Sequence, residues 1–291
     1  MQNETVKRLI ILLVILLIGS GVSVAGGDNG ARYAGVSVFV ICGAWAFLIN
    51  WAAFIPSNAA QTEKFYDLAG SLTYLSVIGL AVGLTPDLSL RAILAALMVV
   101  VWALRLGTFL FIRINQDGHD DRFDDIKINP GRFFIAWTIQ GLWVLMTAAC
   151  AIAIITGESD KPLGLIGFIG LGLWLFGFVI EVVADGQKRA FRKEPTNQGK
   201  FINTGLWAWS RHPNYFGEIT LWLGMAILAL PVLSGFQWVT MISPVFVFLL
   251  LTKVSGIPTL TKKSKQRWGN DPEYQAYLAN TSLLIPMPPK N

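Results

Sequence analysis

The sequence predicts an all-α membrane protein, a polytopic bundle of about eight transmembrane helices. Hydrophobic residues make up 54% of the 291 residues and charged residues only 14%, whereas a soluble domain normally carries roughly 25% charged residues. Apolar stretches of about 17 to 25 residues, the length that crosses roughly 30 Å of hydrocarbon, recur along the chain. A bilayer can solvate such a surface, and water cannot.

The apolar stretches follow one another through the whole chain. The first follows Lys7 and Arg8 and ends near Ser-Val-Ala at 23–25, so it also has the form of a cleavable signal. We favour a retained anchor; cleavage would leave seven spans. The seventh stretch is short, but Pro213 just before it is a favourable first residue for a helix. The expected spans are Leu9–Ala25, Tyr33–Ile55, Tyr66–Leu84, Ala92–Ile112, Phe133–Thr156, Leu163–Ala184, Tyr215–Leu230 and Phe236–Ser255.

The distribution of positive charge predicts the orientation. If the N-terminus is cytoplasmic, 19 of the 23 Lys and Arg residues lie in segments on that side. Only Arg32, Arg91 and Lys161 lie in the outer loops, and Arg105 lies within a span. Such an excess is typical of cytoplasmic loops. We therefore expect both termini in the cytoplasm, with a cytoplasmic tail from about Gly256. The net charge of +5 follows this topological pattern, so no nucleic-acid partner is expected.

Cysteines, histidines and glycines argue against several kinds of site. Cys42 and Cys150 lie in apolar runs without Cys-x-x-Cys spacing, so we interpret them as small hydrophobic residues. His119 and His212 are far apart in the sequence, and no metal site is expected. The glycines at 164, 167 and 170 follow no strand, so they predict close helix packing and not a dinucleotide fingerprint.

Charges within or beside a membrane span are costly, which makes them candidate functional residues. Glu181, Asp185, Lys188 and Arg192 share one helical stripe that runs from the end of the sixth span into a basic loop. Charges that pair with one another at a solvated helix end would explain the same set. Both interpretations remain open for this stripe.

The segment Arg-His-Pro-Asn-Tyr-Phe-Gly-Glu at 211–218 is more specific. Because Pro213 predicts a helix start, unpaired N–H groups and the positive end of the helix dipole lie beside Arg211, which suits an anion such as phosphate. Asn214 and Glu218 share a face one turn deeper. A Glu218–Arg pair that only joins helices is the structural alternative, and we favour function.

Two further sets lie in the first half of the chain. Arg105 in the fourth span precedes a loop with Arg122; a structural pair with Glu181 or Glu218 would also account for Arg105. Asp67, Ser71 and Tyr74 form a stripe at the start of the third span. Asp67 there suits the helix dipole, but a carboxyl group in apolar surroundings can also hold a proton and donate a hydrogen bond.

Several motifs of the second half occur together: Ala184-Asp-Gly-Gln-Lys188-x-x-Phe191, Gly205-Leu-Trp207, Ser210-Arg-His-Pro-Asn-Tyr-Phe-Gly-Glu218, Lys253-Val-Ser-Gly-Ile-Pro258 and Leu284-Ile-Pro286. With these motifs the chain resembles the steroid 5-alpha-reductase superfamily, specifically its bacterial branch of uncharacterised membrane proteins. The resemblance covers about residue 65 to the C-terminus. We therefore expect a two-span segment at 1–64 and a reductase-like membrane domain at 65–291.

The resemblance implies an oxidoreductase that binds NADPH between helices of the C-terminal half and reduces a carbon–carbon double bond conjugated to a carbonyl. The substrate-polarising acid falls at Asp67. The family's catalytic Tyr, three positions before the Arg, is Trp102 here, so Tyr66 and Tyr74 are the candidates to supply the hydroxyl. The implied cofactor contacts and their neighbours are Arg105, Arg122, Asp185, Lys188, Arg192, Lys200, Arg211, His212, Asn214, Tyr215 and Glu218.

The leading hypothesis is an NADPH-dependent reductase of a steroid- or isoprenoid-like substrate in a bacterial inner membrane, with the site facing the cytoplasm. The runner-up is an S-adenosylmethionine-dependent methyltransferase, because isoprenylcysteine and phospholipid methyltransferases share an Arg-His-Pro-x-Tyr-x-Gly element. Six basic residues at 185–211 suit a phosphorylated nucleotide better than a sulfonium cation. A non-enzymatic membrane protein would explain buried charge, but not Asn, Glu and Arg beside a helix start.

Overall fold

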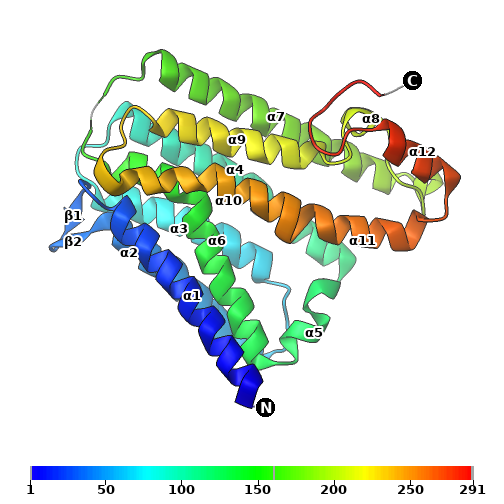
Figure 1. Ribbon diagram of the computed structural model, residues 1–291, viewed down its shortest axis with the longest axis horizontal. Coiled ribbons are helices and arrows are strands. Elements are labelled where there is room, and N and C mark those ends of the chain that lie inside the picture. Colours follow the sequence, from blue (N-terminus) through cyan, green and yellow to red (C-terminus); the bar gives the residue numbers. More distant parts are fainter. Residues whose placement is uncertain (1, 160, 290–291) are drawn as a thin grey trace. The chain divides into compact units, whose positions relative to one another are not determined.

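The protein forms two compact units in a computed structural model that describes residues 2–159 and 161–289 (Figure 1). Unit 1 consists of Met1–Gly167 and Ala229–Ser243, and unit 2 of Phe168–Leu228 and Pro244–Asn291. The predicted division into 1–64 and 65–291 concerns the extent of the reductase-like domain, and it stays a prediction.

The described residues of unit 1 form five long helices, three short helical segments and one short hairpin. Ala34 and Gly35, with φ of 48° and 81°, form the hairpin turn. Left-handed backbone cannot continue a helix, so the second span begins at Val38 and not at Tyr33 as predicted. The elements are α1 (Gln2–Gly26), β1 (Arg32–Tyr33), β2 (Val36–Ser37), α2 (Val38–Ala59), α3 (Tyr66–Leu84), α4 (Leu90–Asp117), η1 (Asp121–Phe123), α5 (Asp124–Lys127), α6 (Pro130–Thr156) and η3 (Gly235–Met241).

Helix α6 is the centre of unit 1. The most apolar window of this helix is 83% buried, against 28–44% for the other candidate spans, so α6 is the helix that the rest of the unit covers. Helices α1, α2, α3 and α4 all pack on it. The rings of Phe133 and Trp137 on α6 are fully buried.

Positive charges gather at one end of unit 1. Arg8 lies against Gly131 at the start of α6, and Lys127 binds Glu63 in the α2–α3 connection at 2.8 Å. Arg91 lies at the other end, where its guanidinium donates to the carbonyl oxygens of Pro162 and Leu163. The cytoplasmic position of the termini stays a prediction.

Seven helical stretches of the described residues are long and apolar enough to cross a membrane, which confirms an all-α polytopic membrane protein. They are one fewer than the eight predicted. The predicted seventh span corresponds to α9 (Pro213–Ala229), which has 17 residues. At 1.5 Å per residue it is about 26 Å long, shorter than the roughly 30 Å hydrocarbon core.

Unit 2 is also helical, and its first helix is longer than predicted. Helix α7 (Gly164–Lys193), which starts at the end of unit 1, continues past Ala184, so residues 181, 185, 188 and 192 do share one helical stripe. Pro213 is the first residue of α9, as predicted. The other elements are η2 (Pro195–Asn197), α8 (Leu206–Trp209), α10 (Ile242–Leu249), the π-helical η4 (Leu250–Val254), α11 (Gly256–Trp268) and α12 (Pro272–Asn280).

Glycines bring the backbones of α7 and α9 into contact (Figure 1). A Cβ atom on Gly177 would lie 2.5 Å from the carbonyl oxygen of Gly217, and one on Gly217 would lie 2.6 Å from the amide nitrogen of Glu181. Gly170 and Gly224 meet in the same way about two turns further along. The predicted close packing is thus confirmed for Gly170, and Gly177 extends it toward Glu181.

The substitution Gly217→Ala should separate the two helices and destabilise the protein by roughly 1–3 kcal/mol, because the new methyl group would overlap backbone atoms that have no rotamer to change. Gly172→Ala is the matched control on α7, since a Cβ there meets nothing within 4 Å. Thermal unfolding of both variants in the same detergent measures the effect. Equal melting temperatures for the two variants would contradict the close crossing.

Candidate functional site

In unit 2, side chains of α7 position the segment that connects it to α9. The side-chain amide oxygen of Gln187 accepts a hydrogen bond from the Leu206 N–H at 2.9 Å. The Trp207 indole donates a hydrogen bond to the backbone carbonyl of Ala184 at 3.0 Å. Gly205 has a φ of 60°, and a Cβ there would collide with the Gln187 amide. The Asp-Gly-Gln and Gly-Leu-Trp motifs therefore work together to fix α8 against α7.

The C-terminal tail holds the same segment from its other side. The buried Ser210 hydroxyl donates to the Leu284 carbonyl at 2.7 Å, and the Arg211 N–H donates to the Ser282 carbonyl at 2.8 Å. On α12, the Tyr277 hydroxyl donates to the carbonyl of Trp207 at 2.7 Å. These bonds give the Leu-Ile-Pro motif a structural task, which is to fix the chain just before α9.

Asp185 and Asn214 meet between α7 and α9. The Asn214 amide donates to an Asp185 carboxylate oxygen at 3.2 Å, and Asp185 is buried. Glu181, one turn earlier on α7, is also buried and lies where Gly217 touches its backbone. Glu218 lies one turn deeper than Asn214 on α9. The structure thus places these four polar groups, Asp185, Glu181, Asn214 and Glu218, along the crossing of α7 and α9.

Two buried nitrogens before α9 have no hydrogen-bond partner among the residues that the structure describes: Nε of Arg211 and Nδ1 of His212. The His212 ring stacks on Tyr215, with 5.6 Å between centroids and 10° between planes. Leaving a buried polar group unsatisfied costs about 1–3 kcal/mol. Both nitrogens adjoin the N-terminus of α9, so an anionic ligand with acceptor oxygens fits there.

The surroundings of His212 are electropositive. Burial, followed by the positive charges of Lys188 and Arg211, lowers the pKa of His212 to about 3. The Lys188 ammonium itself lies 4.5 Å from the ring centroid of Trp207, a cation–π contact that keeps it beside the segment. Lys188, Arg211, His212, Asn214 and Tyr215 therefore form one predicted cluster that the structure does bring together.

A cavity of about 490 Å³ lies one helical turn beyond this cluster, where α7 ends. Three of its lining residues are cations and none is acidic. The Trp268 indole at the end of α11 donates to the Gly199 carbonyl at 2.6 Å, which joins α11 to the loop after α7. The lining residues are Phe191, Arg192, Asn197, Gln198, Gly199, Lys200, Arg267 and Trp268.

Sequence reasoning selected Arg192 and Lys200 but missed Arg267 and Trp268. In the sequence these two residues end a stretch rich in Lys and Arg, and nothing in that stretch distinguishes Arg267 from the other cations. Only the contact between Trp268 and Gly199 reveals which residues of α11 reach the cavity.

In unit 1, the predicted stripe on α3 packs against α4. A Cβ on Gly107 would lie 2.6 Å from the Ser71 hydroxyl oxygen. The ring of Tyr74 meets Trp102 edge-to-face, with 5.1 Å between centroids and 87° between planes. Arg105, half-buried, lies 5.6 Å from the ring centroid of Phe109. The Tyr74 ring thus packs directly on Trp102, which stands where the resemblance implies a tyrosine.

Tyr66, the other candidate hydroxyl, has a structural task. Its hydroxyl donates to the Ala136 carbonyl on α6 at 2.9 Å. Its ring lies between Phe123 and Trp137, at 4.7 and 5.0 Å between centroids. The hydroxyl and the ring of Tyr66 are thus both engaged in packing within unit 1.

Arg122 lies in the loop before α6, near Asp67 at the start of α3. Its Nε donates to both carboxylate oxygens of Asp120, at 3.0 and 2.9 Å. Partial desolvation by its neighbours lowers the pKa of Arg122, but the hydrogen bonds and charge of Asp120, together with the charge of Asp67, outweigh this effect and raise the pKa. The backbone N–H of Asp120 in turn donates to the buried carboxylate of Glu63, which fixes the loop.

Three exposed side chains of the same loop, His119, Asp121 and Asp124, have possible ligand atoms within 4.8 Å of one another. Asp124 also contacts the ammonium group of Lys127 at 3.4 Å. Exposed acidic groups often gather without a metal ion, so this group carries no metal assignment.

These observations define an integral membrane protein with a polar, basic cluster at the end of a membrane-spanning helix. A model of the family described as "Protein of unknown function (DUF1295)" matches residues 53–281. The chain therefore belongs to this family.

Relatives add the resemblance to reductases. The chain is 25% identical over 289 residues to the uncharacterized protein C594.04c of Schizosaccharomyces pombe, covering 87% of this chain and 81% of that protein. It is 33% identical over 119 residues to 3-oxo-5-alpha-steroid 4-dehydrogenase 1 of Rattus norvegicus, 40% of each chain. It is 33% identical over 94 residues to "Probable O-methyltransferase ustE" of Ustilaginoidea virens, 32% of each chain. No solved structure matches significantly.

These matches confirm the predicted likeness to the steroid 5-alpha-reductase-like superfamily. The chain spans less than half of the steroid enzyme that it matches. The bacterial branch and the link to isoprenylcysteine methyltransferases stay predictions.

His212 should remain neutral from about pH 8 down to about pH 5, because burial lowers its pKa to about 3. The unfolded chain takes up this proton near pH 6.5, so the contribution of His212 to stability is complete above about pH 6.5 and is lost as the pH falls toward 3. Histidine NMR on a His119→Asn variant, which leaves a single histidine, measures the titration. A midpoint above about pH 5 would show that His212 is accessible to water.

Proposed function

We propose that the protein is an NADPH-dependent membrane reductase that reduces a carbon–carbon double bond conjugated to a carbonyl group in a lipophilic, steroid- or isoprenoid-like substrate. The observation that carries this proposal is the arrangement in unit 2, where a cavity with three cations follows two unsatisfied buried nitrogens at a helix N-terminus. In this proposal the protein lies in a bacterial inner membrane and its site faces the cytoplasm.

The residues of unit 2 suit a nucleotide that carries several phosphate groups. Arg192, Lys200 and Arg267 offer charge-assisted hydrogen bonds to phosphate oxygens, and arginine does so with a two-pronged geometry. Trp268 gives the cavity an aromatic surface on which a base can stack. Nearer the membrane, Asp185, Asn214 and Glu218 offer polar groups for the remainder of the cofactor.

NADPH, when bound, would supply the hydride for the β-carbon of the substrate. The chain's part is to polarise the carbonyl group. A hydroxyl from Tyr74 and a proton on Asp67 can each donate a hydrogen bond to the carbonyl oxygen, where negative charge grows during the reaction. The low dielectric of the bundle strengthens such a bond. Trp102, packed against the Tyr74 ring, fixes its orientation.

An S-adenosylmethionine-dependent methyltransferase is the alternative, and the partial match to the Ustilaginoidea virens protein favours it. Its cofactor carries a sulfonium cation, and a cavity lined by three cations and no acid repels positive charge. A non-enzymatic membrane protein is a third possibility, which leaves the unsatisfied nitrogens of Arg211 and His212 unexplained.

The purified protein should bind NADPH in the micromolar range, around −8 kcal/mol, and more tightly than NADH, because the cationic cavity can pair with the additional phosphate. Arg192→Gln should weaken NADPH binding about tenfold or more. The neighbouring Lys193→Gln is the matched control, since Lys193 does not line the cavity. Nucleotide titration in detergent measures both. Equal affinity for NADPH and NADH, or tight S-adenosylmethionine binding with neither, would refute the cofactor assignment.

Two amide substitutions should separate cofactor binding from chemistry. Glu218→Gln should weaken nucleotide binding, because a neutral amide loses a charge-assisted hydrogen bond of roughly 1.5–3 kcal/mol. Asp67→Asn should leave nucleotide affinity nearly unchanged and depress NADPH oxidation with a panel of enones. The opposite pattern would invert the two assignments. No effect of either variant would mean that both carboxylates are structural.

A further inference from the structure

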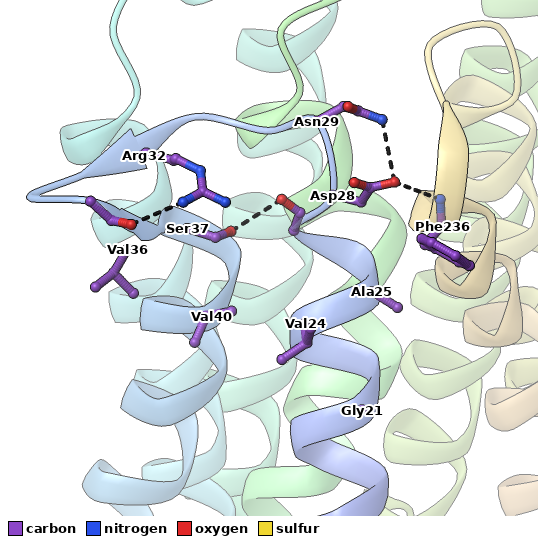
Figure 2. Close-up of a pocket in the computed structure, with 12 residues that line it drawn as sticks. Gly21, Val24, Ala25, Asp28, Asn29, Arg32, Val36, Ser37, Val40 and Phe236 are labelled. Atoms are coloured by element: carbon purple, nitrogen blue, oxygen red, sulfur yellow. Dashed lines mark hydrogen bonds between the residues drawn. The ribbon is translucent and has the colours of Figure 1, made fainter.

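A second cavity, of about 650 Å³, lies within unit 1 where α1 ends and α2 begins (Figure 2). Its lower wall is apolar and comes from Val24 on α1 and Val40 on α2. Its upper wall is polar and comes from Asp28, Arg32 and Ser37 in the connection between these helices. The cavity is therefore amphipathic along the helix axes.

The two charged groups of this wall keep bonding capacity that the protein does not use. One Asp28 carboxylate oxygen accepts hydrogen bonds from the Phe236 N–H at 2.8 Å and from the Asn29 amide at 3.3 Å. Its other oxygen bonds to none of the described residues. One amino group of Arg32 donates to the Gly35 carbonyl at 3.0 Å, and the remaining guanidinium donors bond to none of the described residues. In Figure 2 Ser37 lies between the two charged side chains.

The position of the cavity matches a membrane–water boundary. The first candidate span ends at Gly26 and the second begins at Val38, so the charged groups lie just beyond the apolar segments. Below them Val24 is 66% exposed, and a side chain on Gly21 would meet nothing within 4 Å. This open apolar groove is exposed at the depth where lipid tails lie.

The charges of Asp28 and Arg32 indicate which class of lipid headgroup fits the cavity. A headgroup with phosphate alone would suit Arg32 but would also meet the negative charge of Asp28. A headgroup with both a phosphate and a primary ammonium suits both side chains, since the ammonium can donate hydrogen bonds to the free Asp28 oxygen. We propose that this cavity binds the headgroup of phosphatidylethanolamine, with its phosphate on Arg32, its ammonium on Asp28 and an acyl chain along Val24 and Val40.

Native mass spectrometry of the full-length protein in detergent can test this proposal by competition. Phosphatidylethanolamine, phosphatidylcholine and phosphatidylglycerol with identical acyl chains are added at equal concentration. We expect the first to be retained several-fold more than the other two, because choline has no N–H donor and glycerol has no positive charge. Equal retention, or a preference for phosphatidylglycerol, would overturn the proposal without any variant.

Substitutions then locate the site. Asp28→Asn, which keeps an acceptor for the Phe236 N–H, should reduce phosphatidylethanolamine retention to the level of phosphatidylcholine. Arg32→Gln should reduce the retention of all three lipids several-fold, because each of them carries the phosphate. Asp87→Asn and Lys64→Gln make the same charge changes at exposed positions elsewhere in unit 1 and should change nothing. Retention that survives both cavity substitutions, or that falls equally in the controls, would place lipid binding elsewhere. The result is independent of nucleotide binding, so it stands apart from the proposed reductase activity.

Discussion

The backbone contact between α7 and α9 is the constraint on which the arrangement of unit 2 depends. Four glycines, two on each helix, allow this contact, because a side chain at any of them would overlap main-chain atoms of the partner. In a membrane, where water does not drive helices together, such close packing is a main source of association. It holds the start of α9 beside Asp185, so that Asn214 can reach the carboxylate at 3.2 Å.

The close contact also buries polar backbone groups of the chain between α7 and α9, and the C-terminal tail and α12 provide hydrogen-bond partners for several of them. A chain that turns from α7 into α9 buries backbone groups, and each buried donor or acceptor needs a partner. The tail supplies partners through Ser282 and Leu284, and α12 does so through Tyr277. Among the described residues, two buried side-chain nitrogens of this connection, Nε of Arg211 and Nδ1 of His212, are left without a hydrogen-bond partner.

Sequence reasoning predicted correctly those features that depend only on local backbone geometry. Pro213 predicted the start of α9, and the 181–192 spacing predicted a helical stripe, because both depend on local geometry. It failed where tertiary contacts decide. The role of Arg267, for example, depends on a hydrogen bond that the Trp268 indole donates to a loop far away in the sequence. Tyr66 and Tyr74 look alike in sequence and differ in their ring contacts, since Tyr66 packs on Phe123 and Trp137 and Tyr74 packs on Trp102.

The resemblance to reductases rests on the quoted motifs of unit 2, whereas unit 1 carries Trp102 where that resemblance implies a tyrosine. The tyrosine that packs edge-to-face on Trp102 is Tyr74, which comes from α3 and not from α4. A hydroxyl that approaches from the neighbouring helix would meet a carbonyl oxygen in a different position. In the proposed reductase, the cofactor chemistry would therefore be retained while the shape of the accepted substrate changes.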